Sequence, residues 1–135
     1  MSDERRVLRP EGWPRPSGYA DGIATTGRML SISGQIGWDP VTCTFATDDF
    51  AEQTAQALRN VVAVLRAGGA GPEHLVRLTW YVTDRAAYVA ARRAIGAAYR
   101  EILGAHYPAM SVVIVAGLLE ERALVEIEAT AVVST

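Results

Sequence analysis

Two stretches of the chain repeat apolar residues every three or four positions, which is the spacing of an amphipathic helix. The first begins at Asp49, with Glu52 three residues later in a capping-box-like arrangement, and the glycine pair Gly68-Gly69 ends it. The second follows Thr83-Asp84 and ends at Gly104. We therefore predict two helices separated by one intervening segment.

The segments around these helices have the pattern of strands. Residues 76–82 alternate between two faces, whereas residues 112–116 are apolar throughout, and residues 124–133 carry one fully apolar face. Residues 18–34 read as a β-hairpin that turns at Gly27-Arg28. Before it, residues 1–17 contain three prolines and predict an extended lead-in that leaves room for a further strand.

The predicted order, β-β-α-β-α-β-β, indicates an α+β fold with one sheet and two helices on one face. Two helices cover only one face of such a sheet. Yet the run 112–116 is apolar on both sides, which is typical of a strand that is buried on both faces. We therefore expect another copy of the chain to cover the second face in a closed oligomer.

Composition limits the function without identifying it. The 135 residues predict one domain, 1–135, and a net charge of -2 offers no electrostatic footprint for nucleic acid or an anionic membrane. All 13 basic residues are arginine, so Schiff-base catalysis by a lysine side chain is excluded. The charged start is unlike a signal peptide, and with Cys43 as the only cysteine we expect a cytoplasmic protein.

Two carboxylates, Glu126 and Glu128, share one face of the last predicted strand. Because burial of an unpaired carboxylate costs several kcal/mol, they belong either to a site or to ion pairs at a subunit interface. The two histidines, His74 and His106, have no neighbours at metal-ligand spacing, and we expect structural or surface roles for them and no metal site.

A family resemblance adds to this interpretation. The stretch Pro108-Ala109-Met110-Ser111, followed by apolar residues and then Val125-Glu126-Ile127, resembles the Rid (YjgF) family of reactive intermediate deaminases, also called L-PSP endoribonuclease-like proteins. Gly18-Tyr19 and Ser33-Gly34-Gln35 match it as well, and the likeness spans residues 18–133. It implies a chorismate-mutase-like fold and a homotrimer with a barrel core and a small-molecule cleft at each subunit interface.

The resemblance also implies chemistry. In deaminating members an arginine after Pro-Ala holds the substrate carboxylate, and a glutamate on the last strand assists attack by water on an imine, without cofactor or metal. By position the glutamate is Glu126, the candidate catalytic residue, but the arginine position holds Met110. Methionine cannot bind a carboxylate, so the departure weakens the expected deaminase activity.

The expected cleft draws its residues from several segments. Gly34 and Arg92 are expected to enter across the subunit interface. Arg92 lies at the edge of the second helix's apolar stripe, and we hypothesise that it restores the missing charge. Arg93 and Arg100 are expected to face solvent. Met110 offers a soft apolar wall, which beside aromatic residues suggests an aromatic or acyl-bearing ligand. The predicted substrate-binding set is Tyr19, Ser33, Gly34, Trp38, Arg92, Met110 and Val112.

Three functions remain in view. The first is a cofactor-free hydrolase acting on an enamine or imine with a non-standard substrate. The second is a trimeric small-molecule-binding or pathway-accessory protein without turnover. The third, an endoribonuclease, is disfavoured by the acidic balance and the lack of a catalytic histidine pair.

Overall fold

The centre of the protein is a four-stranded mixed sheet. The computed structural model describes residues 5–134, and its main sheet has the strand order β3-β6-β4-β5. The strands are β3 (Arg28–Ile36), β4 (Leu75–Val82), β5 (Ala109–Ile114) and β6 (Val125–Val133). Only the β4–β5 pair is parallel, and β5 is an edge strand because it comes last in this order. The α+β fold class is confirmed.

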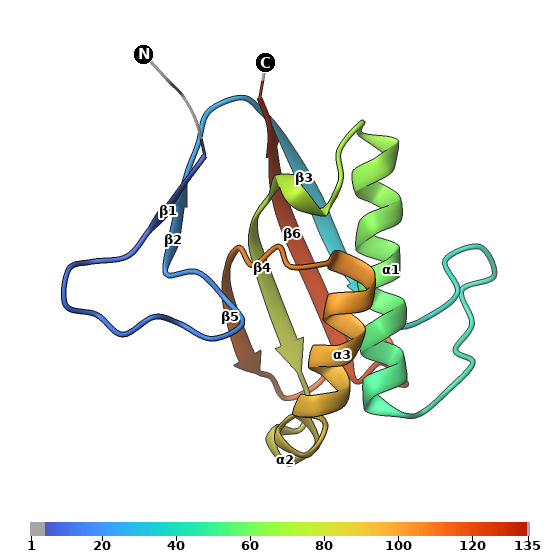
Figure 1. Ribbon diagram of the computed structural model, residues 1–135. Helices are drawn as coiled ribbons and strands as arrows, with labels where there is room; N and C mark the ends of the chain where they lie inside the picture. The colour runs from blue at the N-terminus through green and yellow to red at the C-terminus, as the bar shows by residue number, and fades with distance from the viewer. Residues whose placement is uncertain (1–4, 135) are drawn as a thin grey trace.

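The helices lie on one face of this sheet (Figure 1). They are α1 (Phe50–Ala67), α2 (Arg85–Ala90) and α3 (Arg92–Leu103), with a short 3-10 turn at Pro72–His74. The Asp49 carboxylate caps α1 by accepting from the Glu52 N–H at 2.9 Å, and Gly69 follows the helix with φ 76°. Of the described residues, none belongs to a helix long and apolar enough to cross a membrane.

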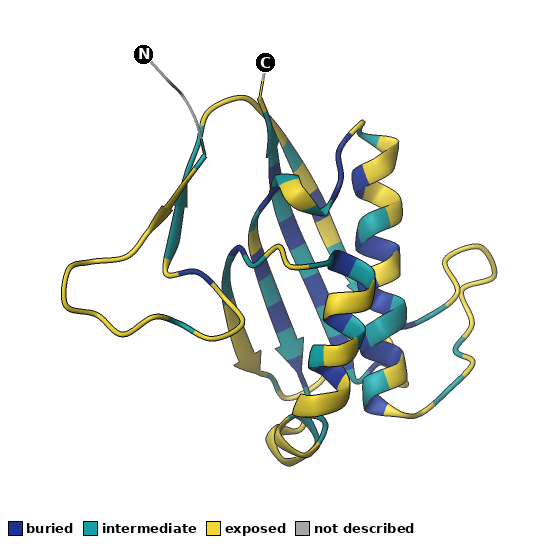
Figure 2. Cartoon of the chain, in the orientation of Figure 1, coloured by how far each residue is buried: buried dark blue, intermediate teal, exposed yellow. Residues whose placement is uncertain are grey.

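Alternation along the strands decides where the core lies (Figure 2). On β6, Val125 and Ile127 are fully buried toward the helices, while the alternate residues Glu126 and Glu128 are half-buried on the opposite face. The core between sheet and helices is built from residues of α1, α3, β4 and β6, among them Leu58, Val61, Leu65, Leu78, Trp80, Val82, Ile95, Leu103, Val125 and Ile127.

The expected hairpin over residues 18–34 is wrong. Residues Gly22–Ala24 form β2, which pairs with β1 (Arg6–Leu8) in a separate two-stranded sheet, and β3 pairs with β6 instead. The prediction of a single sheet is corrected accordingly, and the lead-in contains the further N-terminal strand. The physical reason is that an apolar pattern identifies a strand but not the strand beside it.

The second predicted helix is two helices. Asp84 caps α2 by accepting from the Ala87 N–H at 3.1 Å, and the axis changes at Ala91, which ends α2 and precedes α3. No glycine or proline marks the break. The strand expected at 112–116 begins earlier, at Ala109, and ends at Ile114.

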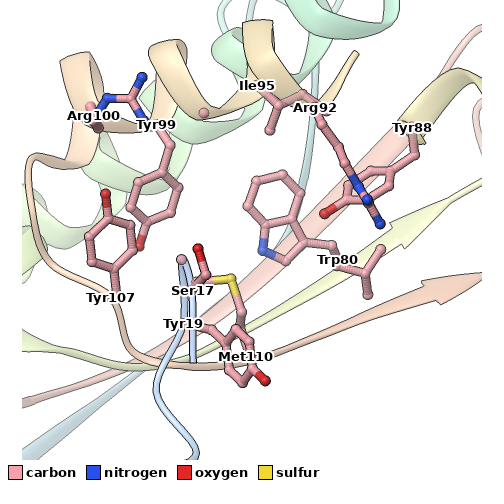
Figure 3. Close-up of a pocket in the computed structure, with 13 residues that line it drawn as sticks. Ser17, Tyr19, Trp80, Tyr88, Arg92, Ile95, Tyr99, Arg100, Tyr107 and Met110 are labelled. Carbon is pink, nitrogen blue, oxygen red and sulfur yellow. The ribbon is translucent and has the colours of Figure 1, made fainter. Parts of the chain in front are cut away.

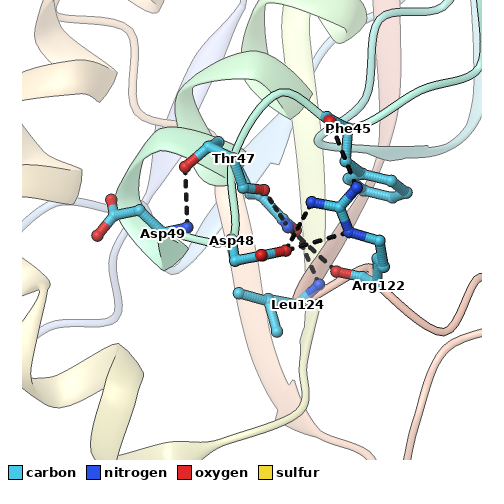
Figure 4. A network of polar contacts seen from close by, with 7 residues as sticks. Phe45, Thr47, Asp48, Asp49, Arg122 and Leu124 are labelled. Carbon is cyan, nitrogen blue, oxygen red and sulfur yellow. Dashed lines mark hydrogen bonds and ion pairs between the residues drawn. The ribbon is translucent and has the colours of Figure 1, made fainter.

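Two buried amides on α1 hold the long loops around the sheet. Gln53, fully buried, donates to the carbonyls of Thr47 and Arg122 at 3.0 and 3.1 Å and accepts from the Leu124 N–H at 2.9 Å (Figure 4). Asn60 donates to two carbonyls at residues 36 and 38, both at 3.0 Å. Backbone groups in these loops have no neighbouring strand with which to form hydrogen bonds, and the two amide side chains supply the missing partners.

Candidate functional site

A cleft of about 690 Å³ lies between α3 and the edge strand β5 (Figure 3). This volume is in the range of small-molecule sites. The side chains that surround it come from the N-terminal loop, β4, α2, α3 and β5. They are Ser17, Tyr19, Trp80, Tyr88, Arg92, Ile95, Tyr99, Arg100, Tyr107, Met110 and Val112, with Gly18 and Gly96.

Strand register brings Met110 and Val112 to this cleft. They pair with Leu78 and Trp80 of β4, whose side chains point toward the helices, so Met110 and Val112 share that face. Tyr19 reaches the same place because the next residue, Ala20, donates its N–H to the Pro108 carbonyl at 3.0 Å. Three predicted site residues therefore lie together beside β5.

Tyrosines form one end of the cleft. The rings of Tyr99 and Tyr107 stack with centroids 5.1 Å apart and an angle of 6° between their planes. The Tyr99 hydroxyl donates to the His106 carbonyl, and burial raises the pKa of Tyr99. The phenol is therefore neutral and fixed at physiological pH, and the pair gives the cleft a rigid aromatic wall.

Arginines flank the cleft along α3. Arg92 lies over the Tyr88 ring, 5.9 Å from guanidinium carbon to ring centroid, and Arg100 lies near Gly96, two turns further along the helix. Arg92 therefore lines the same cleft as Met110 within one chain, so the expectation that it enters across a subunit interface is corrected. Arg100 is exposed but also lines the cleft, so the expectation that it simply faces solvent is corrected.

Glu126 lies on the other face of the sheet. It pairs with Tyr81 of β4, away from the helices, and its side chain packs against the backbone of Gly34. A Cβ atom at Gly34 would be 2.6 Å from the Glu126 carboxyl carbon, so only glycine allows this approach. Glu126 makes no hydrogen bond or ion pair with another residue of the range 5–134.

Glu128, two positions along, differs. Its carboxylate accepts from the Tyr81 hydroxyl at 2.7 Å, and this hydrogen bond raises the pKa of Tyr81. Glu128 is thus engaged within its own chain. The site interpretation fits Glu126 better than Glu128.

The two remaining predicted residues lie outside the helix-side cleft. Ser33 adjoins Gly34 on β3 and accepts a 3.3 Å hydrogen bond from Gln35. Trp38 is in the loop after β3, where its ring lies 5.9 Å from the Phe45 ring. The structure thus divides the predicted set between two faces of one sheet.

Sequence reasoning missed part of the cleft. Tyr99, Tyr107, Arg100 and Trp80 are absent from the predicted substrate-binding set. Trp80 is buried, and its indole N–H is the one buried side-chain polar group between residues 5 and 134 without a hydrogen-bond partner. The spacing of Arg92, Gly96 and Arg100, one residue per turn, was the available signal.

Fold and site together define a class: an α+β protein whose helices cover one face of a mixed sheet, with a cationic, aromatic cleft beside the edge strand. Comparison with known proteins gives the family. Residues 14–133 match the model for the family described as endoribonuclease L-PSP. The chain belongs to this family, the Rid family.

Individual relatives cover nearly the whole chain. A RutC family protein of Pyrococcus horikoshii is 32% identical over 94% of this chain and 97% of its own. A human protein named 2-iminobutanoate/2-iminopropanoate deaminase is 29% identical over 95% and 90%. A Rid-family protein of unknown function from Yersinia pestis superimposes with a TM-score of 0.83, at 36% identity over 96% and 98% of the two chains.

Proposed function

We propose that the protein binds a small molecule in a cleft completed by a second copy of the chain, and hydrolyses a carbon–nitrogen double bond there. The carrying observation is the placement of Glu126. It has no partner among the described residues, and Gly34 opens the backbone beside it, but it lies on the sheet face opposite Met110 and Arg92. One chain alone cannot bring the two half-sites together.

A cyclic arrangement resolves this separation. In a closed head-to-tail oligomer, the helix-side cleft of one copy meets the Glu126 face of the next copy, and every interface makes one complete cleft. We propose a homotrimer of this kind. Its contact would also cover the exposed apolar side chains of β5, Val112, Val113 and Ile114.

The proposed reaction needs no group beyond water and a carboxylate. The Glu126 carboxylate accepts a proton as the water oxygen forms a bond to the imine carbon, and the C=N electron pair moves to nitrogen. Proton transfer to that nitrogen then allows the C–N bond to break. Ammonia leaves and a carbonyl compound remains, so one water is consumed for each ammonia released.

A second function is favoured by Met110. Because methionine cannot bind a carboxylate as arginine does, the cleft would hold its ligand with lower charge complementarity. The protein would then be a small-molecule-binding or pathway-accessory protein without turnover. This function differs from the first in a single measurable respect, the formation of product.

The first experiment measures keto-acid formation from imines that an amino-acid oxidase generates in the assay. We expect Glu126→Gln to lower the rate by roughly 100-fold or more, the range for loss of a general base. Glu128→Gln is the matched control, because it lies on the same strand face and its amide oxygen can still accept from Tyr81. Equal rates in the two variants would refute the role of Glu126, and no turnover by the wild type would favour the binding function.

The second experiment tests the shared cleft by complementation. Gly96→Trp would fill the helix-side half, where an added Cβ meets only the end of Arg100 at 3.4 Å, and Glu126→Gln disables the other half. In an equal mixture of the two inactive variants, half of the copies supply an intact helix side and the other half supply an intact Glu126. About one quarter of the shared clefts therefore contain both intact parts, and the mixed oligomers should regain about one quarter of wild-type activity. Mixed oligomers as inactive as the separate variants would show that the cleft is not shared between copies.

A further inference from the structure

The charge of the helix-side cleft specifies the ligand. Arg92 and Arg100 both line it, and neither forms an ion pair with a residue in the described range 5–134. Within one chain, no aspartate or glutamate is among the residues that surround the cleft. The neighbouring copy proposed above would add one carboxylate, Glu126, to two guanidinium groups, so one positive charge remains for an anionic ligand. A planar guanidinium binds a carboxylate through two parallel hydrogen bonds.

The walls of the cleft specify a second property. Trp80, Tyr99 and Tyr107 are three of the five aromatic side chains that line the cleft, and the last two are stacked on one another. A carboxylate with a three-carbon skeleton has about six heavy atoms, which fill roughly 180 Å³ at the 30 Å³ that a water takes in the liquid. The cleft of a single chain measures about 690 Å³. Even where the proposed neighbouring copy takes up part of this volume, the aromatic walls leave room for a ring.

Trp80 adds an unused donor between the two arginines. Its indole ring is only 3% exposed, and its N–H lacks a partner among the described residues. In Figure 3 the nitrogen is on the edge of the ring that is turned toward Met110 and Ser17. Since a methionine side chain changes rotamer easily, displacement of Met110 by a ligand would expose this N–H to an acceptor.

We propose that the ligand is an aromatic carboxylate, whose carboxylate binds the Arg92 guanidinium and whose ring occupies the space lined by Trp80, Tyr99 and Tyr107. This inference rests on the proposed function, of which it specifies the substrate class and the anchor. The group that binds the ligand carboxylate is then on α3, at Arg92, and not on β5, where the family resemblance places an arginine at position 110. Met110 becomes an apolar contact for the ligand, because thioethers pack favourably against aromatic rings.

Calorimetric titration of the full-length protein tests the assignment with three stable probes: 3-phenylpropanoate, propanoate and the uncharged 3-phenyl-1-propanol. We expect 3-phenylpropanoate to bind at least roughly tenfold more tightly than propanoate, since burial of a phenyl ring is favourable by about 1.5–3 kcal/mol, which is that factor or more. Arg92→Ala should raise the Kd of 3-phenylpropanoate roughly 10- to 100-fold, the range for a hydrogen-bonded charged pair. It should leave the Kd of the alcohol unchanged.

Arg93→Ala is the matched control. It removes the same charge from the next residue of α3, which is exposed as Arg92 is but does not line the cleft. Net charge and helix propensity therefore change equally in the two variants. If Arg92→Ala and Arg93→Ala weaken 3-phenylpropanoate to the same extent, Arg92 is not the anchor. If propanoate binds as tightly as 3-phenylpropanoate, the ring site is wrong.

The outcomes separate this inference from the hydrolase proposal. Glu126-dependent hydrolysis that prefers the imine of alanine to that of phenylalanine would overturn the aromatic assignment and keep the hydrolase. Arg92-dependent binding of 3-phenylpropanoate without turnover of any imine would overturn the hydrolase and keep the ligand class.

Discussion

Gly34 is the position at which a single methyl group should separate function from stability. The backbone of Gly34 is not in the left-handed region, so alanine fits its conformation. The added Cβ, however, would lie 2.6 Å from the carboxyl carbon of Glu126 and 2.7 Å from its Cγ. An ordinary van der Waals contact begins at 3.4 Å, so the carboxyl carbon must move by 3.4 minus 2.6, or about 0.8 Å.

The two consequences of this displacement differ in size. Rotation of the Glu126 side chain away from its preferred rotamer costs about 0.5–1.5 kcal/mol, and the loss of glycine's freedom in the unfolded chain offsets about 0.4–1 kcal/mol. The free energy of unfolding should therefore change by less than about 1 kcal/mol. A shift of a reacting group by nearly 1 Å lowers the rate by on the order of 100-fold.

Urea denaturation and the imine assay measure the two effects on the same preparation. Gly117→Ala is the matched control, because a Cβ there meets nothing within 4 Å and should leave both quantities unchanged. Full activity in Gly34→Ala would refute the assignment of Glu126 as the group that handles water. A loss of several kcal/mol of stability would refute the argument that the side chain, and not the backbone, yields.

Three further changes test other parts of the structure. Gln53→Leu removes three loop hydrogen bonds and leaves the Leu124 N–H and two carbonyls unpaired. In urea denaturation the free energy of unfolding should fall by about 2–4 kcal/mol, and a change below about 1 kcal/mol would contradict the role of the buried amide. Met110→Arg places another guanidinium in the cleft beside Arg92 to donate hydrogen bonds to the substrate carboxylate, and kcat/KM for the imine of alanine should rise by roughly tenfold or more. An unchanged value would mean that the absence of an arginine at position 110 does not limit activity. Because the folded pKa of Tyr99 is raised, its contribution to stability is complete below the unfolded pKa of about 10 and is lost as pH rises through the folded pKa, at about 1.4 kcal/mol per pH unit. Above about pH 10, the free energy of unfolding should therefore fall less steeply with pH in Tyr99→Phe than in the wild type, and an identical slope in both proteins would refute this contribution.

Periodicity predicted the elements that have a continuous buried face. The α1 helix repeats its apolar residues over 18 residues and is capped by Asp49 as expected. Buried and less buried residues alternate along β4 from Leu78 to Val82 and along β6 from Val125 to Ala131. Each of these elements packs one face against the same core, and a buried face requires apolar residues at the period of the helix or strand, which the sequence shows directly. The same reasoning fails where burial is weak.

The N-terminal ribbon shows that failure. All three residues of β1 are exposed and those of β2 are half-buried, so neither strand has an apolar face that a pattern could reveal. Their pairing depends on backbone hydrogen bonds between Arg6–Leu8 and Gly22–Ala24, which any side chain permits. The break at Ala91 is similar, because alanine is compatible with both a helix interior and a helix end.

The site was predicted only as far as each residue carries its own signal. Glu126 stood out because a carboxylate is unusual in an apolar strand, and Met110 because it replaces an expected arginine. The tyrosine wall has no such signal: Tyr99 is in the apolar stripe of α3, and Tyr107 precedes a proline in a loop. Only the packing of that loop against α3 places the two rings together.

Two observations support the proposal that a second copy of the chain completes the site. The first concerns burial: Val112, Val113 and Ile114 are 37%, 42% and 44% exposed at the outer edge of the sheet, a cluster of apolar surface that a soluble chain normally covers. The second concerns chemistry: the cationic cleft and the Glu126 carboxylate occupy opposite faces of that sheet. A contact in which the β5 edge of one copy meets the Glu126 face of its neighbour satisfies both, because it buries the apolar edge and brings a carboxylate to a cleft that contains none. If Met110 and Glu126 lay on the same face of the sheet, one chain could form the whole site, and only the exposed β5 edge would indicate that copies of the chain associate.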